Sequence, residues 1–349
     1  MPTNAQQGPR AIVLGCAGER LSAEERRLFS AADPFGFVLF RRNCHDPDQL
    51  RALVDEMRAA VGRADAPVLI DQEGGRVARL QPPHWRRYPA AARIGALPDP
   101  LAAEAAWLGA RLMADDLAAL GITVDALPVL DLPAPGADPV IGERAYGTEP
   151  ERVARLGRAV CEGMLAGAVL PIVKHIPGHG RAQVDSHRDL PRVDASGELL
   201  MATDFAPFRA LSAMPWAMTA HIVYTAIDPD APATFSRRII DEIIRRDIGF
   251  DGVLVSDDIS MGALQGSLAE RTRRALAAGC DLALHCNGVL AEMEEVAEAT
   301  PPLSAPAQAR LTRAEALRQR SVQAFDRKAA EARFAALLGE TAVAARAGG

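Results

Sequence analysis

Short apolar runs alternate with longer amphipathic stretches along most of the chain. The apolar runs are rich in Val, Ile, Leu and Ala and are bounded by turn-forming or charged residues. Runs of this length and composition predict buried β-strands. The predicted strands are Ala11–Cys16, Gly36–Phe40, Val68–Asp71, Thr123–Leu127, Ile172–His175, Ala217–His221, Val253–Asp257 and Leu282–His285.

Between these runs, apolar residues recur at helical spacing. The predicted helices are Ser22–Ala32, Pro47–Val61, Pro100–Leu120, Glu149–Ala166, Ser236–Ile248 and Gly262–Ala278. Eight strand–helix units in succession favour an α/β fold with a parallel sheet, and they predict a single (β/α)8 TIM-type barrel over residues 11–290.

The pattern after residue 290 is purely helical and rich in Ala and Arg. The predicted helices are Glu292–Ala297, Pro306–Ala324 and Asp326–Leu338. The amphipathic spacing of Leu311, Leu317 and Val322 predicts that extra C-terminal helices (residues 291–349) pack on the outside of the barrel. A membrane-surface or partner-binding helix is the alternative, but mixed charge and few aromatic residues disfavour it.

Length, hydrophobic content and net charge bear on the number of domains and on nucleic-acid binding. The chain has 349 residues, of which 49% are hydrophobic, and a formal net charge of −6. Length alone allows two or three domains, but a barrel with additions also fits. The acidic balance gives no sign of nucleic-acid binding.

The expected location is the cytoplasm. Residues 1–10 form a polar N-terminal tail followed by a short strand, which is not the pattern of a secretory signal. The longest uncharged stretch, Ala210 to Ile227, contains Pro215 and His221 and does not resemble a membrane span. Five scattered cysteines without paired spacing indicate reduced thiols: Cys16, Cys44, Cys161, Cys280 and Cys286.

The fourteen residues from Lys174 to His187 carry the most informative chemistry in the chain. They include three histidines and Asp185, directly after a predicted strand. Pro177, Gly178 and Gly180 prevent the strand from continuing. In parallel α/β proteins, ligands and catalytic groups gather at the carboxyl ends of strands, so this loop is a candidate site.

Two interpretations of the loop remain open. In an extended segment, Asp185 and His187 would lie on the same side, within reach of a carboxylate–imidazole hydrogen bond suited to proton transfer. Alternatively, His175, His179, Asp185 and His187 supply possible zinc ligands, although their spacing does not match the helical His-Glu-x-x-His motif. Any one of these histidines, His179 especially, could instead satisfy backbone groups of a turn.

A second group of residues favours catalysis without a metal. The apolar run Gly252–Val255 leads to Ser256, Asp257 and Asp258. Asp258 or Ser260 could cap a helix beginning near Gly262. Asp257 lies nearer the strand, and its side chain would project into the barrel mouth. A carboxylate facing a His–Asp pair suits acid/base and nucleophilic cleavage of a C–O bond.

At these positions the chain resembles the bacterial β-N-acetylglucosaminidases of glycoside hydrolase family 3. Their signature is Lys-His-[Phe/Ile]-Pro-Gly-His-Gly, four variable residues and Asp-Ser-His, and residues 174–187 fit it without a gap. Residues 36–43, 70–80 and 140–144 match further segments of the family in the expected order. The resemblance covers most of positions 11–290.

The resemblance implies a role for individual residues. It implies that Asp257 is the nucleophile that forms a covalent glycosyl-enzyme, and that His187 is the general acid/base with Asp185 as its partner. The positions implied to hold N-acetylglucosamine in the −1 subsite are Asp71, Arg79, Arg144, Lys174 and His175. Outside the motifs, Arg79 and Arg144 would be interpreted as solvated surface residues.

The implied activity is that of a retaining exo-β-N-acetylglucosaminidase that needs neither metal nor cofactor. The implied substrate is a muropeptide of recycled cell wall, with terminal N-acetylglucosamine on 1,6-anhydro-N-acetylmuramic acid. The acid in this scheme is an imidazole with an ordinary pKa of about 6.5, so Asp185 would help by favouring the imidazolium. We expect the Gly-rich loop to bring His187 into place when substrate binds, and we expect a monomer.

Three other functions are compatible with the sequence. A glycoside phosphorylase is the nearest, because a neutral imidazole base does not repel phosphate as a carboxylate would. A zinc-dependent barrel hydrolase and a non-catalytic sugar-binding protein are more distant.

Overall fold

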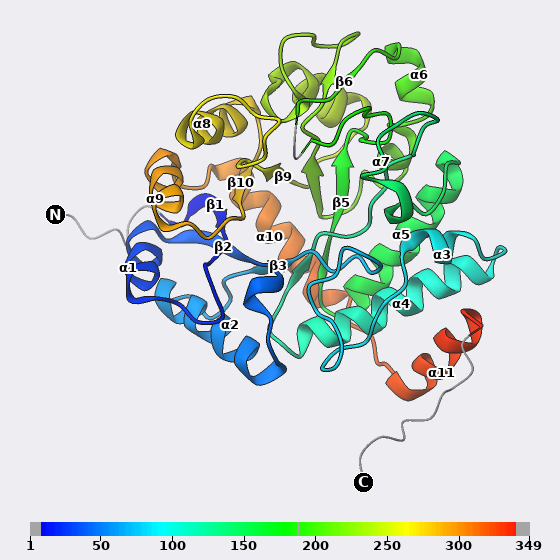
Figure 1. Cartoon of the computed structure of the whole chain (residues 1–349), viewed down its shortest axis with the longest axis horizontal. Helices are drawn as coiled ribbons and strands as arrows, with labels where there is room; N and C mark the ends of the chain where they lie inside the picture. The colour runs from blue at the N-terminus through cyan, green and yellow to red at the C-terminus, as the bar shows by residue number, and fades with distance from the viewer. Residues whose placement is uncertain (1–7, 187–188, 340–349) are drawn as a thin grey trace.

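Eight parallel strands close into a barrel, which confirms the predicted fold class (Figure 1). The structure is a computed structural model that describes residues 8–186 and 189–339. Around the barrel the strand order is β1-β10-β9-β7-β5-β4-β3-β2. Their bounds are β1 (Arg10–Leu14), β2 (Pro34–Leu39), β3 (Val68–Ile70), β4 (Val124–Asp125), β5 (Leu170–Ile176), β7 (Trp216–Thr219), β9 (Val253–Asp258) and β10 (Leu282–His285).

Helices outside the barrel follow successive strands (Figure 1). They are α1 (Ala23–Ala32), α2 (Pro47–Val61), α4 (Leu101–Ala118), α5 (Pro150–Ala166), the π-helix η5 (Ile239–Asp247), α8 (Leu268–Ala278) and α9 (Leu290–Ala299). Local sequence fixes several of their ends. Ser22 and Glu25 form a capping box at the start of α1, and Gly62 ends α2 with a φ of 65°.

Several short elements were not predicted because they are shorter than one clear hydrophobic period. They are α3 (Ala91–Gly95), α6 (Gly197–Ala202), α7 (Ala206–Ala210), the single-turn helices η2 (Arg41–Asn43), η3 (Gly142–Arg144) and η4 (Ala233–Phe235), and the two-stranded sheet of β6 (Arg192–Val193) and β8 (Val223–Tyr224). The prediction for α8 was wrong at its start. Residues 262–267 lie outside the helix, which begins after the capping box of Ser267 and Glu270.

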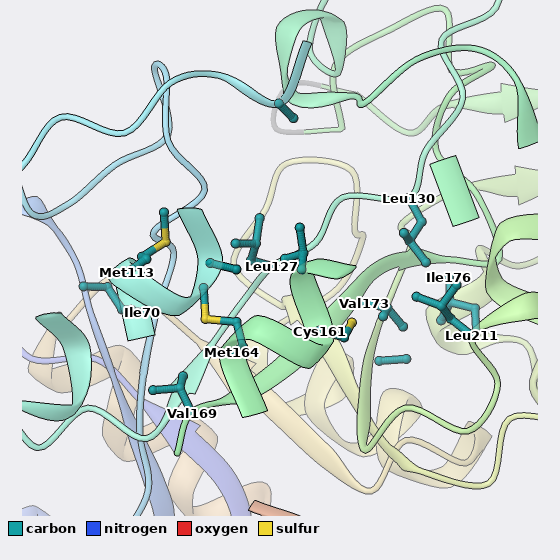
Figure 2. Close-up of a cluster of buried hydrophobic side chains, with 14 of the residues drawn as sticks. Ile70, Met113, Leu127, Leu130, Cys161, Met164, Val169, Val173, Ile176 and Leu211 are labelled. Carbon is teal, nitrogen blue, oxygen red and sulfur yellow. The ribbon is translucent and has the colours of Figure 1, made fainter. Parts of the chain in front are cut away.

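The core has two layers separated by the barrel wall. On β5, Ile172 belongs to the cluster inside the barrel, whereas Val173 belongs to the cluster between strands and helices. Figure 2 shows part of this outer layer, where Val173 and Ile176 lie near Cys161 of α5. Because side chains alternate along a strand, Lys174 turns inward like Ile172. A charged residue is thereby placed at the mouth of the barrel.

The long C-terminal helix packs against barrel residues through Leu311 and Leu317 of the predicted face, whereas Val322 is exposed. Ala307 and Ala314 of helix α10 (Ala305–Arg320) belong to the inner cluster of strand residues (Figure 1). Its arginines reach the start of several strands: Arg310 pairs with Asp251 and Asp281, and Arg318 donates to the carbonyl of residue 168. Helix α10 therefore closes the amino-terminal end of the barrel. The small side chains of Ala307 and Ala314 allow the helix to lie close to the strands.

The last helix, α11 (Arg327–Leu337), packs on α4. The ring of Phe334 is buried and lies over Gly109, where a Cβ would meet ring atoms at 3.0 Å. Arg327 pairs with Asp115 and Asp116, both at 2.7 Å. In the part of the chain that the structure describes, no helix is both long and apolar enough to cross a membrane.

Candidate active site

The carboxyl ends of the strands surround a cavity of about 430 Å³. This volume lies in the range of small-molecule sites, roughly 300–1,000 Å³. The cavity brings together six of the eight predicted site residues: Asp71, Arg79, Arg144, Lys174, His175 and Asp257. Asp185 is half-buried in the loop after β5, and its neighbour Ser186 lines the cavity. His187 lies outside the described residues, so its predicted pairing with Asp185 stays a prediction.

Asp71 follows β3 and binds two cations. Its carboxylate accepts from Lys174 Nζ and from a terminal nitrogen of Arg79, each at 2.9 Å. Burial would raise the pKa of Asp71, but the ammonium and the guanidinium outweigh it and hold the pKa well below its ordinary value. Asp71 is therefore an ionised acceptor fixed at the cavity wall.

Glu73, which was not predicted, completes this charged cluster. It receives two hydrogen bonds from Arg144, both at 2.8 Å, and lies 2.7 Å from Lys174 Nζ. Burial opposes ionisation of Glu73, yet Lys174 and Arg144 lower its pKa, and the carboxylates in turn raise the pKa of Lys174 against its burial. Three cations and two carboxylates thus form a preorganised polar surface that can bind the hydroxyl groups of a sugar.

Replacing Lys174 with methionine should destabilise the protein in a pH-dependent way. The change leaves two buried carboxylates short of a cation, which typically costs about 3–5 kcal/mol. Because the folded-state pKa values of Asp71 and Glu73 are lowered, the stability they contribute is fully present above their unfolded pKa values of about 4 and is lost progressively as pH falls from there through the lower folded-state values. Urea unfolding should therefore show a smaller difference in the free energy of unfolding between wild type and variant at pH 3 than at pH 7.

Lys328→Met is the matched control, because Lys328 is exposed on α11. It should change the free energy of unfolding by less than about 0.5 kcal/mol at either pH. If Lys174→Met lowers the free energy of unfolding by the same amount at both pH values, lost packing and not lost charge pairing destabilises the variant.

His175 is oriented by Asp131, a second residue that was not predicted. Asp131 is fully buried, and its carboxylate lies 2.7 Å from His175 Nδ1. It also accepts the backbone N–H groups of His175 and His179, the latter at 2.6 Å. Burial opposes ionisation of Asp131, but His175 lowers its pKa. Since the carboxylate occupies Nδ1–H, the Nε2 atom of His175 is the nitrogen available to the cavity.

Asp257 lies at the end of β9 as a half-buried carboxylate. It accepts the backbone N–H of Asp258 at 2.8 Å. Burial would raise the pKa of Asp257, but electrostatic interactions with His175 and His221 and the backbone hydrogen bond lower it. Asp257 is therefore ionised at neutral pH, the form in which a carboxylate can act as a nucleophile.

Asp258 does not cap a helix, contrary to one sequence-based possibility. Its carboxylate accepts from the backbone N–H and hydroxyl of Ser260 at 3.0 and 2.7 Å, and from the N–H of Cys286 at 3.3 Å. Helix α8 begins six residues further on than expected, and Ser267 caps it. Asp258 thus holds the turn after β9 and ties it to β10.

His221 follows β7 but does not line the cavity. It is fully buried, with its ring nitrogens 2.7 Å from Thr234 Oγ1 and 3.0 Å from the carbonyl of Asp258. Burial lowers its pKa. Its place beside the Asp258 carbonyl indicates that it supports the end of β9.

The described part of the predicted zinc-ligand set is engaged in other contacts. His175 bonds Asp131, and His179 Nε2 lies 3.1 Å from Ser186 Oγ. Within residues 8–186 and 189–339, no group of three or more His, Cys, Asp or Glu side chains is arranged to hold a metal ion. Asp185 lies within the described residues, and His187, the fourth member of the set, lies outside them.

Comparisons with known proteins place the chain in a family. "Beta-hexosaminidase" from Alkalilimnicola ehrlichii is 42% identical over 283 residues, covering 79% of this chain and 80% of that protein. The crystal structure of NagZ from Neisseria gonorrhoeae in complex with N-trifluoroacetyl-D-glucosamine is 37% identical with a TM-score of 0.83, over 95% of this chain and 99% of that one. NagZ in complex with a zinc ion, 36% identical over the same shares, gives a TM-score of 0.82.

The sequence signature described as the Glycosyl hydrolase family 3 N terminal domain matches residues 11–316. This range includes all eight barrel strands, the cavity and most of α10. The chain therefore belongs to glycosyl hydrolase family 3 and is a glycoside hydrolase of the β-hexosaminidase type.

Proposed function

We propose that the protein is a retaining exo-β-N-acetylglucosaminidase that acts through a covalent glycosyl-aspartate. The observation that carries the proposal is an ionised Asp257 that lines the same cavity as Asp71, Lys174 and Arg144. The similarity to NagZ, crystallised with N-trifluoroacetyl-D-glucosamine, supports an N-acylated glucosamine as the sugar. Muropeptides of recycled cell wall are the substrates we propose.

In the first chemical step, an oxygen of Asp257 attacks the anomeric carbon while the bond to the leaving oxygen breaks. His187 donates its proton to that oxygen, so the aglycone departs as a neutral alcohol. In the second step, neutral His187 takes a proton from water, whose oxygen attacks the anomeric carbon and releases Asp257. Two displacements at one carbon retain the β configuration.

The sugar is held by the five other predicted residues, in the roles we propose for them. Asp71 and Nε2 of His175 offer hydrogen-bond acceptors, while Arg79, Arg144 and Lys174 offer donors. All five are fixed by contacts with one another, with Glu73 or with Asp131 before substrate arrives, which reduces the entropy that binding costs. We further propose a cytoplasmic monomer whose partner is this small-molecule substrate, without nucleic acid or membrane.

The test is turnover of an aryl β-N-acetylglucosaminide, with the matching aryl β-glucoside as the control that lacks the acetamido group. The N-acetylglucosaminide should be cleaved at least ~10²-fold more efficiently, and proton NMR should show the β-anomer of the free sugar appearing first. Repeating the assay with inorganic phosphate separates hydrolysis from phosphorolysis. Formation of sugar 1-phosphate would make the protein a phosphorylase, and no turnover of either glycoside would leave a sugar-binding role.

Chelators should leave this activity unchanged, because no step above uses a Lewis acid. The question is open to test because NagZ has also been crystallised with a zinc ion. Purified protein is dialysed against a chelator, its metal content is measured by mass spectrometry, and the aryl substrate is assayed before and after. Activity that falls with the zinc content and returns when zinc is added back would replace this mechanism with a metal-assisted one.

A further inference from the structure

Ser186, which precedes His187 in the chain, is fixed from two sides. It is 3% exposed, and its hydroxyl oxygen lies 3.1 Å from His179 Nε2. Its carbonyl oxygen accepts the backbone N–H of Ala263 at 3.2 Å. His179 belongs to the loop after β5, and Ala263 belongs to the loop after β9, the strand that carries Asp257. Ser186 is therefore the point where the two loops that follow these strands meet.

His179 is itself held rigidly on the barrel. It is 3% exposed, its backbone N–H donates to Asp131 at 2.6 Å, and its ring meets that of His175 edge to face at 5.5 Å between centroids. Burial and the neighbouring His175 lower the pKa of His179 to about 4. At neutral pH the ring is uncharged, so it acts as a hydrogen-bond partner and not as an acid.

The tautomer follows from the second ring nitrogen. Nδ1 of His179 is buried and has no hydrogen-bond partner among the described residues. An unpaired buried N–H is rarer than an unpaired acceptor, so Nδ1 carries the lone pair and Nε2–H donates to Ser186 Oγ. The hydrogen bond therefore runs from a fixed imidazole to the loop residue.

We propose that His179 and Ser186 are positioning residues that hold the loop carrying Asp185 and His187 against the barrel for general acid catalysis. The inference rests on the proposed acid/base role of His187. Asp131 has a double function in this arrangement, since it orients His175 in the cavity and fixes the backbone of His179. The side chain of His179 is thereby assigned to the proton-transfer step and not to sugar binding.

The experiment measures Ser186→Ala on a series of aryl β-N-acetylglucosaminides whose leaving groups differ in pKa. Removing one neutral hydrogen bond should lower kcat/KM about tenfold for poor leaving groups, which need protonation, and less than ~3-fold for a dinitrophenyl glycoside. A plot of log(kcat/KM) against leaving-group pKa should therefore be steeper than for wild type. Ser186→Thr keeps the hydroxyl and should restore most of the wild-type slope.

Ser236→Ala is the matched control. Ser236 is also buried, and its hydroxyl binds Asp228 and the N–H of Ile239 away from the cavity. It should lower the Tm without changing the slope. His179→Asn should resemble Ser186→Ala, and its Tm is measured so that instability is not mistaken for a kinetic effect.

The outcomes separate this inference from the proposed function. A steep slope for His187→Ala together with a wild-type slope for Ser186→Ala would overturn the anchoring role alone. A wild-type slope for His187→Ala would overturn the acid/base assignment and the role of Ser186 with it. A slope change in Ser236→Ala as large as that in Ser186→Ala would show that the effect reflects general loss of stability.

Discussion

Replacing Asp257 with alanine should abolish turnover of every β-N-acetylglucosaminide, good and poor leaving groups alike. Without the carboxylate no glycosyl-enzyme forms, and the displacement is no longer divided into two easier steps. Removal of a nucleophile elsewhere costs ~10⁴-fold or more in kcat, and we expect a loss of that order. Steady-state rates on a dinitrophenyl glycoside measure it, because that substrate needs no acid and isolates the nucleophile.

Asp258→Ala is the control for this experiment. Asp258 also lines the cavity, but its carboxylate is occupied by Ser260 and by the N–H of Cys286. Its loss should loosen the turn after β9 and reduce activity far less than the loss of Asp257. An inactive Asp258→Ala beside an active Asp257→Ala would transfer the nucleophile to position 258.

Replacing His187 with alanine should separate substrates by their leaving groups. General-acid assistance is typically worth ~10²–10⁴-fold, so hydrolysis of a disaccharide should fall by that factor. A dinitrophenolate departs without protonation, so the same variant should still form the glycosyl-enzyme from the activated substrate. Water attack then becomes slow because its base is missing, and the covalent intermediate should accumulate to a level visible by intact-protein mass spectrometry.

Azide tests the base function of the same residue. A small anion needs no deprotonation, so it should restore turnover of the dinitrophenyl substrate by His187→Ala and yield a β-glycosyl azide. Asp185→Ala should show a weaker form of both effects, because the carboxylate favours the imidazolium. Equal losses on activated and unactivated substrates, without any effect of azide, would make His187 a binding residue.

The sequence was sufficient to predict the barrel fold, because each barrel strand is an apolar run with clear ends. The pattern was less informative about what a buried face packs against. In α10 the predicted face is partly buried at Leu311 and Leu317 but exposed at Val322, and amphipathicity does not distinguish the side of a barrel from its open end. For α8 the start could have been read more closely, since Ser267 and Glu270 are a capping-box pair in the sequence.

The site could be predicted where residues follow a strand directly. Asp71, Lys174 and Asp257 were placed correctly at one mouth for this reason. Asp131 could not be found in this way, because β4 ends at Asp125 and the chain then runs alongside β5 without regular strand pairing. The contact of Asp131 with His175 depends on the backbone hydrogen bonds of Lys174 with Leu130 and Pro128, which no periodicity predicts.

Closure of the barrel also sets the order of events on the ribosome. Ile12 of β1 pairs with Ala283 of β10. One edge of β1, the first strand to be synthesised, therefore stays unpaired until β10 has been synthesised. At roughly 5–20 residues per second, translation leaves that edge unpaired for on the order of tens of seconds. Helix α10, which seals the barrel floor, emerges later still. The nascent chain therefore exposes an apolar strand edge for most of its synthesis, which is when it is most open to aggregation and to chaperone binding.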